Sequence, residues 1–260
     1  QASDNCPIAV WSTDGVFVTP AAAVAAPLKV AAANWHALAA WSGRLVPSGS
    51  GLLIDIGTTT TDIIPLRDGR PASLGRTDLE RLQTGELVYT GVRRTPLAAL
   101  GDAVFIDDQP IRVAAEVFGT TLDLYVWSGD IPEDSTDCDT ANGRPATRPH
   151  TTDRLCRMVC ADQTELAEDQ ISAMVADWTQ RQMRQIHAAL GQVLRRQPSP
   201  CHTVVLSGSG EFLANRIIDG SRSLAGSLRL SLTSKWGRLL ASAACAFSVA
   251  NLAVDSSTVQ

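Results

Sequence analysis

The chain has 260 residues, of which 45% are hydrophobic and 19% charged, and its formal net charge is -5. This length is enough to bury the core of one large domain or of two closely packed lobes, and the composition excludes a disordered chain. An acidic chain without a run of Lys or Arg is a poor nucleic-acid binder, and no apolar stretch reaches the ~18 residues that a membrane span needs.

The first part of the chain predicts one helix followed by antiparallel strands. In the Ala-rich stretch 19–41, Pro27 is expected in the first turn of a helix, apolar residues recur at helical spacing from Leu28 to Trp41, and Gly43 follows as a stop signal. The run 51–57 is typical of a buried strand that enters a tight turn, and apolar residues resume at 63–66. Because Asp68-Gly69 favours a hairpin, we expect two or three antiparallel strands over residues 52–74.

The middle of the chain is less regular, and the last quarter alternates strands with helices. Short strands are expected at 86–90 and 103–106, a helix or a strand at 120–127, and a long polar loop at 129–150. Helices are predicted at 152–160 and, with an amphipathic pattern, from about 165 to 196. The remaining elements are strand 203–206, a glycine-rich turn, helix 211–218, strand 228–232 and a helix over 237–252.

The six cysteines are scattered, without a CxxC pair: Cys6, Cys138, Cys156, Cys160, Cys201 and Cys245. Cys156 and Cys160 are four residues apart, which predicts that they share one face of a helix. They are either half of a metal site or two thiols on an apolar stripe. The second interpretation is favoured because no other Cys or His pair has zinc spacing. So few cysteines in a long chain indicate a reducing compartment, and we expect a cytoplasmic protein.

The segment most informative for chemistry is the turn between the first two strands, Asp55 to Asp62. A carboxylate at the end of a buried strand, such as Asp55, is costly unless it is paired, and a cation is the common partner. Gly57 permits a tight turn whose backbone N–H groups converge, and the hydroxyls of Thr58, Thr59, Thr60 and Thr61 add donors. Such a nest suits a phosphate, while Asp62 on the returning strand can orient a water or a metal ligand. The alternative is a plain hairpin with a Thr-rich turn.

A second glycine-rich segment supports phosphate binding. Ser207, Gly208, Ser209 and Gly210 follow a strand, and Glu211 opens a helix. Small residues let a ligand approach the backbone, and a helix N-terminus offers free N–H groups. Alone this is a common α/β turn; with the Asp55 turn it predicts the second wall of a nucleotide or diphosphate cleft.

Two other sequence patterns, for a calcium loop and for a catalytic triad, are incomplete. The segment 137–148 hints at a calcium loop, but Gly143 falls at position seven and Arg148 occupies the twelfth position, where glutamate is needed. No two histidines share ligand spacing, and no GxSxG elbow is present, which argues against triad hydrolysis.

Several strings together resemble the hydantoinase A/oxoprolinase family, within the actin, sugar-kinase and Hsp70 ATPase superfamily. They are AAANW (31–35), DIGTTTTDIIP (55–65), TGELVYTGVRRTP (84–96), ANGRPAT (141–147), MVCAD (158–162) and SGSGEFL (207–213). Within the family, the chain is similar to members that serve tetrahydromethanopterin-linked one-carbon transfer and methanofuran biosynthesis.

The resemblance implies an α/β fold of the duplicated ribonuclease-H-like, actin/Hsp70 type, with two lobes and a central cleft. Residues 1–50 would be the remainder of an N-terminal lobe with an Ala-rich helix. Residues 51–260 would form the phosphate-binding and adenosine-motif lobe, with the loop at about 129–150 inserted. Family members carry a first phosphate motif upstream, which is not found before Asp4, so we expect the N-terminal lobe to be incomplete.

The resemblance also implies a metal-dependent transferase that condenses a diphosphate-activated furan-type substrate with a phenol or an amine. In that role Asp55 and Asp62 would hold a metal, with Mg²⁺ as the expected ion, and the Thr turn would hold the diphosphate. Glu86 would act as the base, while Arg93 and Arg94 would clamp anionic oxygens or else form a solvated loop pair.

Two alternatives remain open at this point. The chain could be an ATP-dependent hydrolase of the hydantoinase or oxoprolinase type, or a nucleotide-binding protein without catalysis. All three hypotheses involve a small-molecule ligand, ATP or an organic diphosphate, without nucleic acid or membrane, and leave the oligomeric state open.

Overall fold

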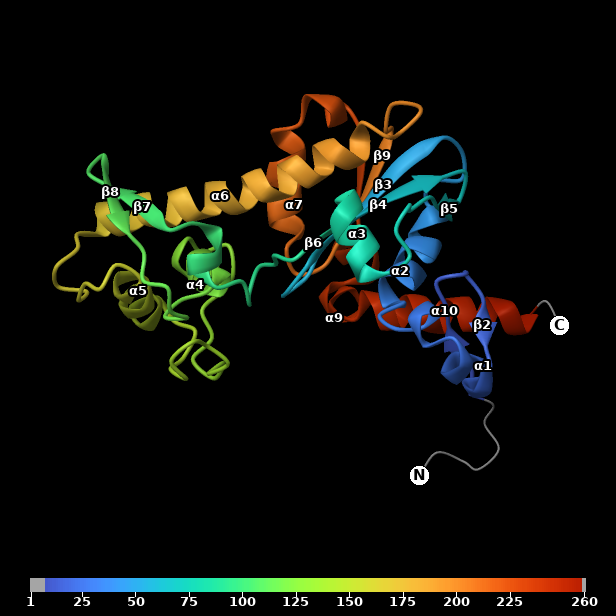
Figure 1. Ribbon diagram of the computed structural model, residues 1–260, viewed down its shortest axis with the longest axis horizontal. Helices are drawn as coiled ribbons and strands as arrows, with labels where there is room; N and C mark the ends of the chain where they lie inside the picture. The colour runs from blue at the N-terminus through green and yellow to red at the C-terminus, as the bar shows by residue number, and fades with distance from the viewer. Residues whose placement is uncertain (1–7, 259–260) are drawn as a thin grey trace.

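The computed structural model describes residues 8–258, and a mixed six-stranded sheet forms its centre (Figure 1). The strands are β3 (Ser50–Ile56), β4 (Thr61–Arg67), β5 (Arg70–Pro71), β6 (Leu87–Val88), β9 (Thr203–Ser207) and β10 (Leu228–Ser231). Their order is β10-β9-β3-β4-β5, with β6 also paired to β4. β10, β9 and β3 run parallel, whereas β4 is antiparallel to β3, β5 and β6. The mixed α/β class and the antiparallel hairpins at 52–74 are confirmed.

Helices cover both faces of this sheet, because side chains along each strand alternate between the faces. Leu52, Ile54 and Ile56 pack on the side of α6 (Glu168–Leu194) and α7 (Glu211–Asp219). Leu53 packs on the side of α2 (Asn34–Gly43), α8 (Leu232–Trp236) and α10 (Ala244–Thr258). Each of these fully buried side chains contributes about 1.5–3 kcal/mol. The same alternation places Asp55 on the face of Leu53.

α6 extends well beyond the sheet and carries the other half of the molecule (Figure 1). Its 27 residues span about 40 Å. Around its N-terminal half lie the hairpin β7 (Ala103–Ile106) and β8 (Gln109–Arg112), with α4 (Thr121–Trp127) and α5 (Arg148–Arg157). The ambiguous segment 120–127 is therefore a helix, and the predicted polar loop lies between α4 and α5. Neither α6 nor any other helix within residues 8–258 combines the length and apolarity that crossing a membrane requires.

The N-terminal segment departs in part from the predicted helix, which was expected to begin around Pro27 and to run to about Trp41. It contains β1 (Val10–Trp11), β2 (Phe17–Val18), α1 (Pro20–Ala25), a 3₁₀ turn (Pro27–Lys29) and then α2. Pro27 disfavours helical backbone at Ala26, which ends α1, and Ala32 has a positive φ of 52°. Trp11 and α2 pack against Leu252 of α10, so this segment shares an apolar cluster with the C-terminal helix.

Two further predictions from helical spacing are wrong. α5 covers residues 148–157, so Cys156 is buried in the helix while Cys160 lies beyond it, exposed, with a left-handed φ of 58°. The two thiols therefore do not share a helix face. The predicted helix over 237–252 is divided at Ala243, whose φ of -114° and ψ of 31° separate α9 (Arg238–Ser242) from α10. Cys6 lies outside the described residues.

Candidate functional site

The turn between β3 and β4 is the first wall of the candidate site. The strand register places Asp55 directly opposite Asp62, and the N–H of Gly57 donates to the carbonyl of Thr60 at 2.9 Å to close the turn. Thr58 is exposed at its tip. Within residues 8–258, the structure shows no protein acceptor for the backbone N–H groups of Thr58, Thr59 and Thr60. The turn therefore presents free donors, as an anion site requires.

The segment 91–94 fixes this turn from outside. The N–H of Val92 donates to the carbonyl of Gly57 at 3.0 Å, and the N–H of Arg94 donates to that of Thr58 at 2.9 Å. A Cβ on Gly91 would lie 2.5 Å from both the Gly57 carbonyl oxygen and the Thr59 nitrogen. By contrast, a Cβ on Gly57 would meet the Thr60 oxygen at an ordinary 3.6 Å. The glycine that the turn needs is thus Gly91, whereas Gly57, which was predicted to permit the turn, is not crowded.

The turn between β9 and α7 is the second wall. Gly208 has a φ of +88°, and a Cβ there would lie 2.2 Å from the Ile56 carbonyl oxygen and 2.7 Å from Oδ1 of Asp55. Gly210 donates its N–H to the same Ile56 oxygen at 2.9 Å. β9 lies beside β3 in parallel register, which aligns Ser207 with Asp55. The two glycine-rich segments therefore meet at the carboxyl ends of adjacent parallel strands, where ligands of α/β proteins commonly bind.

These walls enclose part of a cavity of about 490 Å³. Five predicted site residues line it: Thr58, Arg93, Gly208, Ser209 and Glu211. The other walls come from Leu122 of α4, Asp130 to Pro132 of the following loop, Thr233, and Arg238, Ala241 and Ser242 of α9. Because the sequence predicts a diphosphate site at these two turns, we refer to this space as the diphosphate cavity. Asp55 does not line it but lies directly behind Gly208.

The facing aspartates have different partners. Asp62 forms a close ion pair with Arg81 of α3 (Asp78–Thr84), whose side chain is 2% exposed and stacks 4.0 Å above the ring of Trp35. Among the described residues no cationic side chain forms an ion pair with Asp55. Burial, followed by the charge of Asp62, raises the pKa of Asp55 to about 7, against the effect of the neighbouring Ser207 hydroxyl. Asp55 is therefore the uncompensated member of the pair.

Three predicted residues have structural roles away from the cavity. The Glu86 carboxylate is fully buried and accepts hydrogen bonds from the N–H groups of Leu74 and Gly75, both at 2.8 Å, and from Thr84 Oγ1 at 3.0 Å. Thr61 is buried, and its hydroxyl donates to the Thr90 carbonyl at 2.8 Å. Arg94 extends an exposed side chain. The structure does not bring Glu86 to the cavity, so its expected role as a base has no geometric support.

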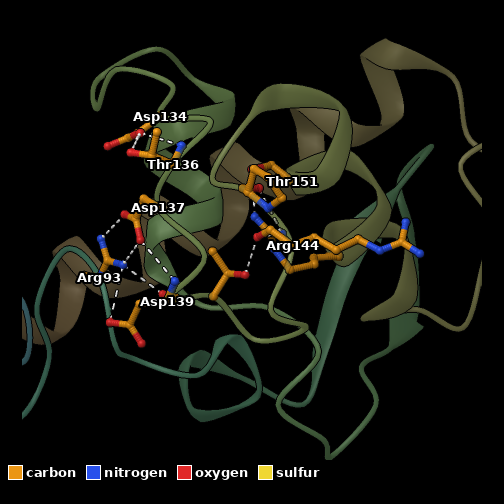
Figure 2. A network of polar contacts seen from close by, with 10 residues as sticks. Arg93, Asp134, Thr136, Asp137, Asp139, Arg144 and Thr151 are labelled. Atoms are coloured by element: carbon orange, nitrogen blue, oxygen red, sulfur yellow. Dashed lines mark hydrogen bonds and ion pairs between the residues drawn. The ribbon is translucent and has the colours of Figure 1, made fainter.

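Arg93 holds the loop between α4 and α5 against the cavity (Figure 2). Its guanidinium donates to both carboxylate oxygens of Asp137 at 2.7 Å and to the Asp139 carbonyl at 2.8 Å. At the other end of the loop, the buried Arg154 donates to Asp123 at 2.7 Å and to Asn142 Oδ1 at 3.1 Å. The acidic string that hinted at calcium binding therefore serves as a partner for arginines. Arg93 is a clamp for its own loop as well as a cavity residue.

The remaining charges around the cavity are compensated, with one exception. Asp130 accepts from both guanidinium nitrogens of Arg216, at 2.9 and 2.6 Å. Glu211 accepts from Ser231 at 2.5 Å and from the N–H and hydroxyl of Thr233, both at 2.9 Å. Arg238 is exposed, lines the cavity and has no acceptor among residues 8–258. Arg238 was not predicted from the sequence, because a lone arginine at the start of a short helix carries no motif.

The side chains at this site can hold a magnesium ion only if a bound ligand supplies further oxygen atoms. No group of three or more His, Cys, Asp or Glu side chains in the described part of the chain is arranged to hold a metal. Mg²⁺ commonly takes one or two carboxylates and completes its shell with water and substrate phosphates. The unpaired carboxylate of Asp55 suits that mode, whereas Oδ1 of Asp62 is already bound to Arg81.

A comparison with known proteins finds the same family that the sequence strings in these walls resemble. The hydantoinase/oxoprolinase family matches residues 1–244. The chain belongs to this family. Two archaeal relatives carry the name (4-{4-[2-(gamma-L-glutamylamino)ethyl]phenoxymethyl}furan-2-yl)methanamine synthase. The protein of Methanocaldococcus jannaschii is 29% identical over 248 residues, which cover 95% of this chain and 72% of the relative.

The second relative, from Methanococcus vannielii, is 40% identical over 119 residues. That match covers 46% of this family member and only 53% of the relative. Among solved structures, a chain of the PilM-PilN type IV pilus biogenesis complex matches with a TM-score of 0.35 and 15% identity, over 85% of this chain and 49% of the other.

Proposed function

We propose that this hydantoinase/oxoprolinase family member is a transferase that joins a phenol to the methylene carbon of a diphosphate-activated furan. The proposal extends the names of the two archaeal relatives, whose product contains a phenoxymethyl furan. It places the chain in the synthesis of a methanofuran-type one-carbon cofactor.

The observation that carries the proposal is a pair of uncompensated charges, one that lines the diphosphate cavity and one directly behind Gly208 in its wall. Arg238 brings a free guanidinium to the diphosphate cavity, and the N–H groups of Thr58 and Thr59 are unpaired among the described residues. Behind the glycine lies Asp55, a carboxylate without a cation. A diphosphate needs donors and cations, and a diphosphate bound to magnesium also needs a carboxylate.

The reaction breaks one C–O bond and forms another. The phenol gives its proton to water, its oxygen bonds to the furan methylene carbon, and the diphosphate leaves with the electron pair of the broken C–O bond. Arg238 and the free N–H groups would stabilise the charge that develops on the leaving group. When bound at Asp55, Mg²⁺ would supply further neutralisation of that charge. Asp62 would stay paired with Arg81, and Glu86 would shape the loop at residues 74–75.

We also propose that residues 50–231 form one lobe of a ribonuclease-H-like fold of the actin and Hsp70 type. The supporting feature is strand order: a meander of β3, β4 and β5, followed by β9 and β10 added parallel to β3 on the other edge. The nucleotide of the ATPases would then correspond to the diphosphate substrate here.

The test is turnover with an (aminomethyl)furan-methyl diphosphate, γ-glutamyl-tyramine and Mg²⁺, with the aryl ether detected by mass spectrometry and the released diphosphate measured separately. Arg238→Ala is expected to raise the KM for the diphosphate substrate roughly ten- to a hundredfold, because a charged hydrogen bond contributes about 1.5–3 kcal/mol. Arg222→Ala, another exposed arginine away from the cavity, is the matched control. Phosphate release from ATP on addition of a hydantoin or oxoproline, without ether formation, would replace the transferase by the hydrolase alternative.

A further inference from the structure

A second cavity, of about 740 Å³, lies along the N-terminal half of α6. Its lining includes Phe105 of β7, Trp127 at the end of α4, and Val175, Ala176 and Met183 of α6. Figure 1 shows that this region, where β7, α4 and α6 come together, is separate from the central sheet. None of the residues predicted from sequence to bind a phosphate lines this space.

The chemistry of its walls suits an uncharged aromatic ring. Phe105 is 49% exposed and Trp127 is held in place by the guanidinium of Arg148, 4.5 Å above its ring. The two carboxylates in the lining are both compensated: Asp130 by Arg216, and Asp177 by Arg181 at 2.9 Å. Aromatic side chains and a methionine contact a ring favourably, and paired charges leave little attraction for an ion.

The two cavities share one residue. Asp130 lines both the second cavity and the diphosphate cavity, and it is fixed by both nitrogens of Arg216 and by the Ser128 hydroxyl at 2.7 Å. An anionic group in one cavity and an aromatic ring in the other would therefore approach each other at this wall. Transfer between two substrates needs this proximity of their reacting ends.

We propose that the second cavity binds the phenolic acceptor as a para-substituted, uncharged aromatic ring, with its hydroxyl directed toward Asp130 and the diphosphate cavity. This inference rests on the transferase proposed above and adds to it the place where the acceptor binds. No residue of the second cavity other than Asp130 contributes to the diphosphate cavity, so the two sites are separable by mutation.

The first pair of variants tests whether a large side chain that fills the second cavity blocks phenol binding. Ala176→Trp places an indole at the lining, and Ala188→Trp makes the same change at an exposed alanine of α6 about 18 Å further along, outside both cavities. The probe is 4-ethylphenol, with binding followed by ligand-observed NMR. We expect Ala176→Trp to raise the Kd at least tenfold, while Ala188→Trp stays within twofold of the unchanged protein.

A second pair of variants removes a wall instead of filling the space. Phe105→Ala is expected to weaken 4-ethylphenol binding several-fold, whereas Ile111→Ala, on the paired strand β8 and outside the lining, should leave it unchanged. Absence of 4-ethylphenol binding to the unchanged protein, or equal effects of the two tryptophan variants, would overturn the inference.

Inorganic diphosphate, titrated into the same proteins with Mg²⁺, separates this inference from the proposed function. Its affinity should be the same in all four variants, because none of them alters the diphosphate cavity. Diphosphate binding without phenol binding would refute the acceptor site alone. Phenol binding without diphosphate binding would instead refute the proposed transferase.

Discussion

Asparagine substitution of the two facing aspartates is expected to change stability in opposite directions. Asp55 has no cationic partner among the described residues, and burial raises its pKa to about 7. Asp55→Asn removes an ionised carboxylate that the folded protein disfavours. Asp62→Asn, at the facing position in the strand register, instead leaves the exposed Asp78, at 3.3 Å, as the one carboxylate paired with the buried guanidinium of Arg81 among the described residues.

The size of each effect follows from these environments. Asp55 keeps its proton in the folded protein up to about pH 7, whereas in the unfolded chain it loses the proton near its ordinary value of 3.8. The free energy of unfolding therefore falls as the pH rises through this window, by about 4 kcal/mol at most. Asp55 is half-buried, so solvent screens part of this effect. We therefore expect Asp55→Asn to raise the free energy of unfolding by about 2 kcal/mol above pH 7 and by almost nothing at pH 4. Breaking the Arg81 pair should cost about 3 kcal/mol.

Urea unfolding of the three proteins at pH 4.5, 6 and 8, in the presence of a chelator, measures both effects. The quantity to compare is the difference between each variant and the unchanged protein, since groups away from this pair titrate equally in all three. A stabilising Asp62→Asn, or an Asp55→Asn protein that is less stable at pH 8, would refute the assignment of Asp55 as the uncompensated carboxylate. Mg²⁺ with diphosphate should then stabilise the unchanged protein but not Asp55→Asn.

Two other predictions use matched controls within the chain. Gly208→Ala should cost about 3 kcal/mol in urea unfolding, because it adds a clash with backbone to an unfavourable φ, while Gly226→Ala, at φ +81° with nothing within 4 Å, should cost only about 1 kcal/mol; equal losses would show that the close approach to Ile56 is absent. Arg93→Gln should make the loop at 128–147 at least fivefold more sensitive to limited proteolysis, whereas Arg94→Gln, whose side chain is exposed, should not; unchanged cleavage would mean that the ion pairs with the loop do not hold it.

The elements that the sequence predicted well are those with a strong local pattern. The strand that became β3 is a continuous apolar run between turn signals, and α6 has an apolar stripe over many turns. Pro27 opens a helical turn as predicted, but this turn is a short 3₁₀ helix, and the positive φ of Ala32 separates it from α2, a break that the apolar spacing does not contain. Helix boundaries near Cys160 and Ala243 likewise depended on local backbone geometry that periodicity does not contain.

The site was predictable where backbone geometry alone brings residues together. Thr58 and Gly208 follow adjacent parallel strands, so any fold with this sheet places them side by side. The burial of Glu86 could not be predicted, because the residues around it in sequence give no sign that two loop N–H groups would bind its carboxylate. Arg81 and Arg238 were missed for a related reason: each acts on a partner or a cavity formed by residues distant in sequence.

The distribution of charge around Gly208 supports one kind of ligand over its alternatives. A neutral ligand would use neither the free guanidinium of Arg238 nor the uncompensated Asp55. A simple anion would pair with Arg238 but would be repelled by a carboxylate directly behind the turn. A phosphate anion that brings its own divalent cation satisfies both groups, since its oxygens meet Arg238 while the cation meets Asp55. Glycine at position 208 would be needed for such a ligand to reach Asp55, because any side chain there would overlap the carbonyl of Ile56 and lie against the carboxylate of Asp55.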